Sequence, residues 1–136
     1  MATRALIHTS ARQIWNALGP GFSERMYHNA MEVCLRHACV PYETERIIPV
    51  TFMNHTLGNL RADLIVENTC IVELKSVRAL KDEHRLQTRM YLRLLGLTDA
   101  ILINFPTHTD TLEIEDIHGD NNSGRITVDS YVEQLC

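Results

Sequence analysis

The fold is decided by the stretch Leu60-Arg-Ala-Asp-Leu-Ile-Val-Glu-Asn-Thr-Cys-Ile-Val-Glu-Leu-Lys-Ser76. Its β-branched and apolar residues predict two short strands, 61–66 and 70–75, on either side of the polar tripeptide Glu67-Asn68-Thr69. Asparagine tolerates the backbone conformations that tight turns require, so this tripeptide is expected to close a β-hairpin. The other elements are expected to pack around that hairpin.

The length of the turn determines which side chains share a face of the hairpin. A three-residue turn places Val66 opposite Cys70, and therefore Asp63 opposite Glu73. One face is then apolar, whereas the other carries Asp63, Glu73 and Lys75 at the end far from the turn. Burying charges is costly unless they are paired or hold a metal ion, so the cluster predicts one of these two roles. The apolar face is predicted to comprise Ala62, Leu64, Val66, Cys70, Val72 and Leu74.

Composition and charge limit the classes of function. The 136 residues, 45% of them hydrophobic and 22% charged, are ordinary for a globular protein, so a single domain spanning 1–136 is expected. The net charge of −4 excludes a general attraction of nucleic acid to the whole surface, and such binding requires a local basic patch. The four cysteines show no C-x-x-C spacing, which predicts reduced thiols rather than a zinc or iron–sulfur site.

The sequence shows no feature of a membrane protein. No apolar run approaches the roughly 18 residues of a transmembrane helix. The first residues lack the charged-then-apolar pattern of a signal peptide. These features predict an intracellular protein, cytoplasmic or, in a eukaryote, nuclear, with no membrane partner.

Hydrophobic periodicity outside the hairpin predicts three helices and three further strands. Apolar residues three and four apart predict the helices, and alternation or continuous apolar runs predict the strands. The order of elements predicts an α/β fold with a central mixed sheet flanked by helices. The expected helices are 4–18, 23–38 and 82–95, and the expected strands are 42–52, 100–105 and 112–117, with a short terminal element at 126–135.

Three helical positions add polar candidates to the hairpin cluster. Glu24 precedes Tyr27 and Met31 by three and seven residues, so it lies on the helix stripe that is expected to face the core. A first-turn acid is also favoured by the helix dipole alone, and both interpretations stay open. In the third helix, Gln87 and Tyr91 are four residues apart and share one face.

A row of arginines runs along the third helix. Arg85, Arg89 and Arg93 are four residues apart and form the most concentrated positive charge in this acidic chain. Such a row is more often a solvated helix face than a binding surface. The alternative is contact with the phosphates of a nucleic-acid backbone.

The hairpin cluster has the residue types needed for metal-assisted hydrolysis of a phosphodiester. The carboxylates of Asp63 and Glu73 can hold Mg²⁺, which keeps several waters and contacts substrate phosphate. Lys75 follows Glu73 by two residues on the same strand face, so its ammonium can reach the attacking water or the charge of the transition state. The alternative is an internal ion pair of Lys75 with either carboxylate.

A resemblance to a known family covers most of the chain. The segment Gly21-Phe-Ser-Glu-Arg-Met-Tyr27 resembles the signature of the GxxExxY proteins, a branch of the PD-(D/E)xK nuclease-like superfamily. Four motifs occur in the family's order and spacing and cover about 7–105, which leaves 106–136 as a C-terminal extension. The further matching segments are 61–67, 71–75, Gln87-x-x-x-Tyr91-Leu92 and 102–105.

The resemblance implies a restriction-endonuclease-like core, in which a central mixed sheet is flanked by helices. It implies Asp63 and Glu73 as ligands of Mg²⁺ or Mn²⁺, and Glu24 as a further acid of the metal site. It also implies that Lys75 is catalytic together with these acids.

Gln87 and Tyr91 resemble the Gln-x-x-x-Tyr element of RecB-like exonucleases, which lies beside the catalytic site and helps to position DNA. The sequence departs from the superfamily at Ala62, which stands where a proline usually precedes the aspartate. The iron–sulfur cysteines of some RecB-like relatives also have no counterpart.

The expected protein is a Mg²⁺- or Mn²⁺-dependent nuclease that hydrolyses DNA, with exonuclease action slightly favoured by the Gln-x-x-x-Tyr element. The alternative is a non-catalytic interaction or scaffold protein on the same fold, with the acidic cluster as an internal ion pair. Acidic net charge and small size favour the alternative a little, because few surfaces remain to bind a duplex. A homodimer that joins two arginine rows would offset that disadvantage.

Overall fold

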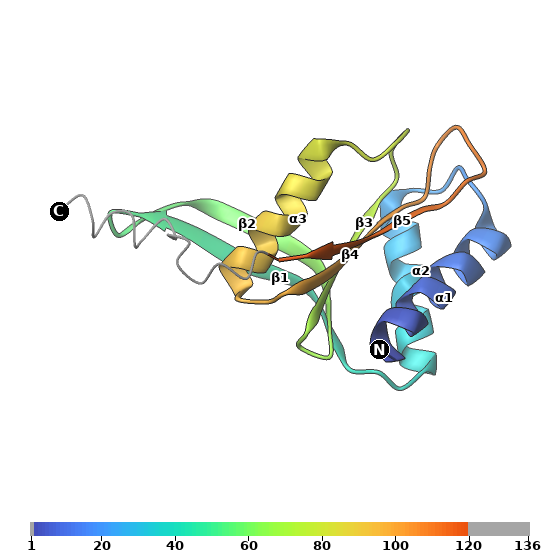
Figure 1. Cartoon of the computed structure of the whole chain (residues 1–136), viewed down its shortest axis with the longest axis horizontal. Coiled ribbons are helices and arrows are strands. Elements are labelled where there is room, and N and C mark those ends of the chain that lie inside the picture. Colours follow the sequence, from blue (N-terminus) through green and yellow to red (C-terminus); the bar gives the residue numbers. More distant parts are fainter. Residues whose placement is uncertain (1, 120–136) are drawn as a thin grey trace.

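Helices cover both faces of a mixed β-sheet in the computed structural model of the chain, which describes residues 2–119 (Figure 1). The predicted α/β fold is confirmed, and each helix and strand that the sequence predicted before residue 118 is present. The element predicted at 126–135 lies outside the described residues. The helices are α1 (Ala2–Leu18), α2 (Glu24–His37) and α3 (Asp82–Leu95). The strands are β1 (Tyr42–Phe52), β2 (His55–Val66), β3 (Cys70–Lys75), β4 (Asp99–Asn104) and β5 (Glu113–His118).

The strands lie in the order β1-β2-β3-β4-β5 across the sheet. β3 and β4 are parallel, and the crossover between them contains α3, whereas the other neighbouring strands are antiparallel. β1 and β2 form a long hairpin whose closed end projects beyond the rest of the sheet (Figure 1). The carboxyl ends of β3 and β4 therefore lie together, at the point where the chain leaves the sheet toward α3.

Two apolar cores hold the sheet between its helices. α1 and α2 pack on one face, where Tyr27, Met31 and Leu64 are fully buried. α3 packs on the other face, where Tyr91 and Leu92 join the core. Successive side chains of a strand point to opposite faces, so the apolar strands β3 and β4 supply both cores. None of the helices in the described part of the chain is long and apolar enough to cross a membrane.

Ala62 lies on the opposite face from the one predicted. It packs with Ile65 and Ile71 in the core beneath α3, whereas Leu64 belongs to the core beneath α1 and α2. Regular alternation would have placed Ala62 with Leu64. The alternation fails at this point because β2 stops pairing with β3 beyond Leu64.

A tyrosine holds the glycine-rich loop between α1 and α2. Gly21 has a φ of +110°, a backbone conformation that residues with side chains rarely adopt. The Tyr27 hydroxyl donates to the carbonyl of Gly19 (2.6 Å) and accepts from the amide of Phe22 (3.3 Å). Ser23 caps α2 with its side-chain oxygen. These contacts are the physical reason why a glycine and a tyrosine flank the start of α2.

Asn104 holds the connection from β3 to α3. Its side chain is fully buried; Oδ1 accepts from the amide of Val77 (2.9 Å), and Nδ2 donates to the carbonyl of Val77 (3.1 Å) and to Oε1 of Glu113 (2.8 Å). The amide of Phe105 donates to the carbonyl of Lys75 (2.9 Å). The backbone that follows Lys75 is therefore attached to the end of β4.

Replacing Asn104 with leucine is expected to lower the free energy of unfolding by about 2–4 kcal/mol, because Val77 and Glu113 lose buried hydrogen-bond partners. Urea denaturation of the purified protein measures this change. Asn29→Leu, at an exposed position of α2, is the matched control and is expected to change stability by less than about 0.5 kcal/mol. Equal stabilities of the two variants would contradict the role given to Asn104.

Candidate active site

The backbone ladder between β2 and β3 ends just before the predicted acidic cluster. It begins at Val66↔Cys70, as the three-residue turn predicted, and includes three residue pairs. Asp63 and Glu73, expected to face each other in the same ladder, do not form a backbone pair. The strands diverge at this point, so their backbone groups need other partners.

Carboxylates take the place of the missing backbone acceptors. Oε2 of Glu73 accepts a hydrogen bond from the amide of Asp63 (2.7 Å), and Oδ2 of Asp63 accepts one from the amide of Leu74 (2.9 Å). We call Asp63 and Glu73 the crossed carboxylates, since each bonds to the backbone of the other's strand. Among residues 2–119, no group donates a hydrogen bond to Oδ1 of Asp63 or Oε1 of Glu73. One oxygen of each acid is therefore left for a ligand.

The surroundings of the crossed carboxylates disfavour two negative charges. Burial raises the pKa of Glu73 to about 8, and the charges of Asp63 and Glu24 act in the same direction. Burial also raises the pKa of Asp63, although the hydrogen bond from Leu74 and the charge of Lys75 oppose the rise. Without a cation, the pair therefore retains a proton at pH values at which ordinary carboxyl groups are ionised.

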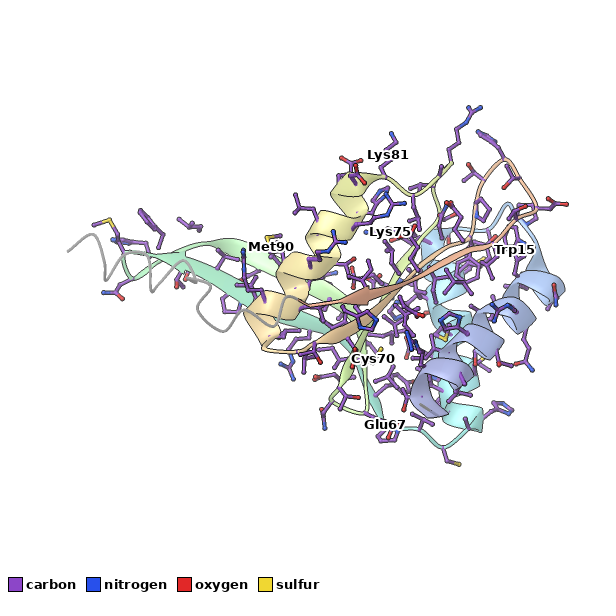
Figure 2. All side chains as sticks on the ribbon, in the orientation of Figure 1. Trp15, Glu67, Cys70, Lys75, Lys81 and Met90 are labelled. Atoms are coloured by element: carbon purple, nitrogen blue, oxygen red, sulfur yellow. The ribbon has the colours of Figure 1, made fainter. Side chains whose placement is uncertain are left out.

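Lys75 is directed toward α3 rather than toward an ion pair. It lies at the end of β3, far from Cys70 at the start of the same strand (Figure 2). Its Nζ donates to Oε1 of Gln87 (3.2 Å). In the part of the chain that the structure describes, Lys75 forms no ion pair with Asp63 or Glu73. The alternative that the sequence left open, an internal ion pair of Lys75 with Asp63 or Glu73, therefore lacks the contact that defines it.

Tyr91 lies one helical turn beyond Gln87 and is 4% exposed. Burial, together with the charges of Glu73 and Asp63, raises the pKa of its hydroxyl to about 12. These effects require Tyr91 to lie near the crossed carboxylates. The structure thus brings both residues of the Gln-x-x-x-Tyr element to the predicted site.

Glu24 is exposed, although it was expected to face the core. It is the first residue of α2, and the buried stripe of that helix starts only at Tyr27. The sequence-based expectation was wrong on this point, because the first turn of α2 does not pack into the core. The charge of Glu24 nevertheless contributes to the raised pKa of Glu73, so the two acids lie within electrostatic range.

The arginine row lies away from the crossed carboxylates. Arg85 and Gln87 are two residues apart, which places them about 200° apart around α3. Arg85 donates two hydrogen bonds to Glu115 of β5, both 2.7 Å long, and pairs with Asp82. Arg89 and Arg93 are exposed. The structure therefore uses Arg85 to attach α3 to β5 and does not bring the row to the site.

Three further residues lie near Asp63, and the sequence analysis did not place two of them, Arg25 and His28, at the site. Glu45 of β1 lies opposite Asp63, at a gap in the ladder between β1 and β2, and has a left-handed φ of 54°. Arg25 of α2 forms an ion pair with Glu45. Burial is the main cause of the raised pKa of Asp63. The charges of Lys75, buried His28 and Arg25 act to lower that pKa. Neither a left-handed strand residue nor contacts between distant elements leave a signal in the sequence.

The crossed carboxylates are the residues that can hold a metal ion. Within residues 2–119, no three His, Cys, Asp or Glu side chains form a metal-binding group. Mg²⁺ does not require such a group, because it keeps several waters and binds through one or two carboxylates plus substrate phosphate. Two hard oxygen donors therefore fit Mg²⁺ or Mn²⁺, and Glu24 lies within electrostatic range of them.

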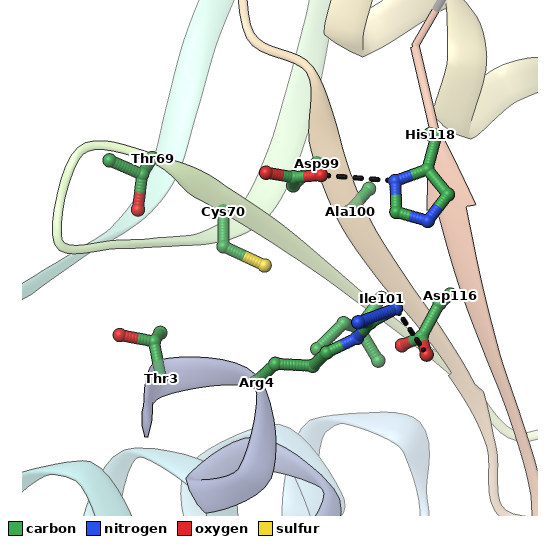
Figure 3. Close-up of a pocket in the computed structure, with 9 residues that line it drawn as sticks. All are labelled: Thr3, Arg4, Thr69, Cys70, Asp99, Ala100, Ile101, Asp116 and His118. Atoms are coloured by element: carbon green, nitrogen blue, oxygen red, sulfur yellow. Dashed lines mark hydrogen bonds and ion pairs between the residues drawn. The ribbon is translucent and has the colours of Figure 1, made fainter. Parts of the chain in front are cut away.

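A separate pocket surrounds Cys70, at the end of β3 opposite Lys75 (Figure 3). Burial raises the pKa of the Cys70 thiol to about 12, and the charges of Asp99 and Asp116 act in the same direction. The thiol is therefore protonated and a poor nucleophile. Asp99 pairs with His118 and Asp116 with Arg4, so these charges already have partners. We do not assign the chemistry to this pocket.

Replacing Glu73 with glutamine is expected to stabilise the metal-free protein at alkaline pH. Because the pKa of Glu73 is raised, the native state keeps a proton that the unfolded chain releases, so the free energy of unfolding falls as pH rises from about 4.5 to about 8. Glutamine removes this dependence and can still accept from the amide of Asp63. Above pH 8, the variant should therefore be more stable than wild type by several kcal/mol, since a difference of one in pKa corresponds to about 1.4 kcal/mol.

Urea unfolding at a series of pH values measures this difference. Glu83→Gln, at an exposed position of α3, is the control and should follow the pH profile of the wild type. A Glu73→Gln variant that is less stable than wild type at every pH would show that the charge of Glu73 stabilises the native state.

Comparisons with known proteins identify the family. Among solved structures, the chain is similar to the crystal structure of SSO0001, with a TM-score of 0.56 and 22% sequence identity. The match covers 72% of this chain and 50% of the other, so the chain spans about half of that structure's length, and at this identity the similarity shows the fold alone. Curated proteins give no significant match. The family model described as the PD-(D/E)XK nuclease superfamily matches residues 2–117, and the chain therefore belongs to this superfamily.

Proposed function

We propose that the chain is a metal-dependent nuclease that hydrolyses phosphodiester bonds in DNA. The crossed carboxylates carry this proposal: two neighbouring acids, each with one oxygen available, lie beside a lysine that neither acid neutralises. A buried carboxylate beside a half-buried one is unfavourable for stability alone, and uncharged side chains would be less costly. Such an arrangement is typical of a site that binds a cation.

Asp63 and Glu73 would hold Mg²⁺ or Mn²⁺ through Oδ1 and Oε1, with Glu24 as a third acid that acts directly or through a water. The raised pKa of Asp63 and Glu73 supports this assignment, because a cation would replace the retained proton and remove the repulsion between the acids. When bound, the ion supplies a water of lowered pKa and polarises a phosphoryl oxygen.

Lys75 would stabilise the negative charge that develops on the phosphate in the transition state. Its hydrogen bond to Gln87 restricts the position of the ammonium group. Tyr91 keeps its proton at neutral pH because its pKa is raised to about 12, so it can donate a hydrogen bond but cannot act as a base. Gln87 and Tyr91 would therefore position Lys75 and the DNA.

The GxxExxY branch is the finer assignment that we propose within the superfamily. The left-handed Gly21, Glu24 at the start of α2 and the loop contacts of Tyr27 support it. Exonuclease action is favoured slightly over endonuclease action, because the Gln-x-x-x-Tyr element resembles that of RecB-like exonucleases and lies beside the acids.

The alternative, a scaffold protein that uses the acidic cluster as an internal ion pair, receives less support because Lys75 bonds to Gln87. DNA is the partner that we propose, which agrees with the expected intracellular location. Arg89 and Arg93 are the exposed members of the arginine row, and a homodimer could join them into one phosphate-binding surface.

Calorimetric titration with Mg²⁺ and Mn²⁺ tests the metal site directly. Wild type is expected to show saturable binding, and Asp63→Asn should lose it while keeping a side-chain oxygen for the amide of Leu74. Titration in buffers of different ionisation enthalpy should show that binding releases protons below pH 8, because the pKa of Glu73 is raised to about 8. Asp110→Asn, at an exposed position, is the control. Identical binding by both variants would exclude Asp63 as a ligand.

Lys75→Met is expected to lower the rate of DNA cleavage by about 100-fold or more while metal affinity stays within a few fold of wild type, since a transition-state contact is lost. Single-turnover cleavage of an end-labelled DNA strand measures the rate. Lys81→Met, at the exposed N-cap position of α3, is the control and should cleave normally. Unchanged cleavage by Lys75→Met would remove Lys75 from the chemistry.

A further inference from the structure

Phe22 is an exposed aromatic residue in the loop that leads to the candidate site. It precedes Glu24 by two residues. Phe22 is 41% exposed. The other aromatic residues with which it forms a cluster are buried, namely Trp15, Tyr27 and Phe105. Phe22 is therefore partly available to a ligand.

Two contacts hold the backbone of Phe22, one to the core and one to the residue that follows Lys75. Its amide donates to the hydroxyl of Tyr27 (3.3 Å), and its carbonyl accepts a long hydrogen bond from Oγ of Ser76 (3.5 Å). Ser76 directly follows Lys75. Phe22 therefore lies beside the carboxyl end of β3, where Lys75 and Gln87 meet.

The ring of Phe22 is the outer member of an aromatic cluster. It contacts Tyr27 edge to face, with ring centroids 6.2 Å apart and an interplanar angle of 89°. Tyr27 in turn stacks on Phe105, with centroids 4.3 Å apart and an interplanar angle of 4°. Tyr27 and Phe105 are fully buried, so the ring of Phe22 packs on a fixed aromatic pair while the residue itself stays 41% exposed.

Only part of the positive charge near the site is unpaired. A duplex is bound mainly through its phosphates, which requires available lysines and arginines. Arg25 is paired with Glu45, and Arg85 is paired with Glu115 on the far side of α3, whereas Arg61 and Arg78 are exposed. A single strand also offers unpaired bases, whose faces can stack on an aromatic side chain whatever the sequence.

We propose that Phe22 is a base-stacking residue that selects single-stranded nucleic acid. An unpaired base packs on its ring while the adjacent phosphate lies at the crossed carboxylates and Lys75. The inference rests on the proposed nuclease function for the position of the phosphate, and it adds the substrate class: a single strand or the unpaired end of a duplex. The bases of an intact duplex are stacked on each other and are not available to Phe22.

Fluorescence of 2-aminopurine tests the stacking directly, because stacking on an aromatic ring quenches this base. The probe is a short single-stranded DNA that contains 2-aminopurine, titrated with protein in the Lys75→Met background so that the strand is not cleaved. Phe22 is expected to quench the probe, and Phe22→Leu should abolish the quenching and weaken binding roughly tenfold. Phe22→Trp keeps a planar ring and should retain both.

Two controls separate stacking from other effects. Leu57→Ala removes an exposed apolar side chain of β2, 64% exposed, and should quench and bind as the Lys75→Met parent does. The same probe annealed into a duplex should show no quenching, and a single-stranded RNA probe shows whether the sugar matters. Circular dichroism checks that each Phe22 variant is folded, as expected for an exposed position.

The outcomes also separate this inference from the proposed function. Equal quenching by Phe22→Leu and its Lys75→Met parent would overturn the stacking role even if wild type cleaves DNA. Quenching of the duplex probe equal to that of the single strand would overturn the substrate class. If quenching depends on Phe22 but wild type shows no metal-dependent cleavage, the result would support the stacking site and reject the nuclease function.

Discussion

The divergence of β2 and β3 at Asp63 and Glu73 is the constraint on which the candidate site depends. Buried backbone amides must have acceptors, and here the acceptors are carboxylates that reach across the gap between the strands. This arrangement places buried Glu73 beside half-buried Asp63 and raises the pKa of both. An intact ladder at this point would satisfy the amides by itself and leave both acids without a structural role.

The other elements hold polar groups around the divergent strands. α3 brings Gln87 to Lys75 and Tyr91 to the acids, and Asn104 attaches the connection that leads to α3. The loop held by Tyr27 leads to Glu24. Buried acids reduce stability, and the two apolar cores on either side of the sheet offset this cost. A site that holds unfavourable charges in a well-packed fold is typical of catalytic proteins.

Local patterns in the sequence were sufficient for most of the fold, because they depend on neighbours along the chain. Apolar spacing predicted all three helices, and the three-residue turn predicted Val66 opposite Cys70. The same reasoning failed at Ala62 and Glu24. It assumed regular periodicity, whereas at Ala62 β2 no longer pairs with β3, although it still pairs with β1, and the first turn of α2 lies outside the core.

The sequence by itself determined which groups are available: two acids and a lysine on one hairpin, a glutamine and a tyrosine on one helix face, and the motifs of a nuclease-like family. Only the tertiary structure decided their partners. It bonds Lys75 to Gln87 instead of an acid, pairs Arg85 with Glu115, and attaches Phe22 beside Ser76. Each of these contacts joins residues far apart in the chain. Their geometry follows from how the helices pack on the sheet, which no local period encodes.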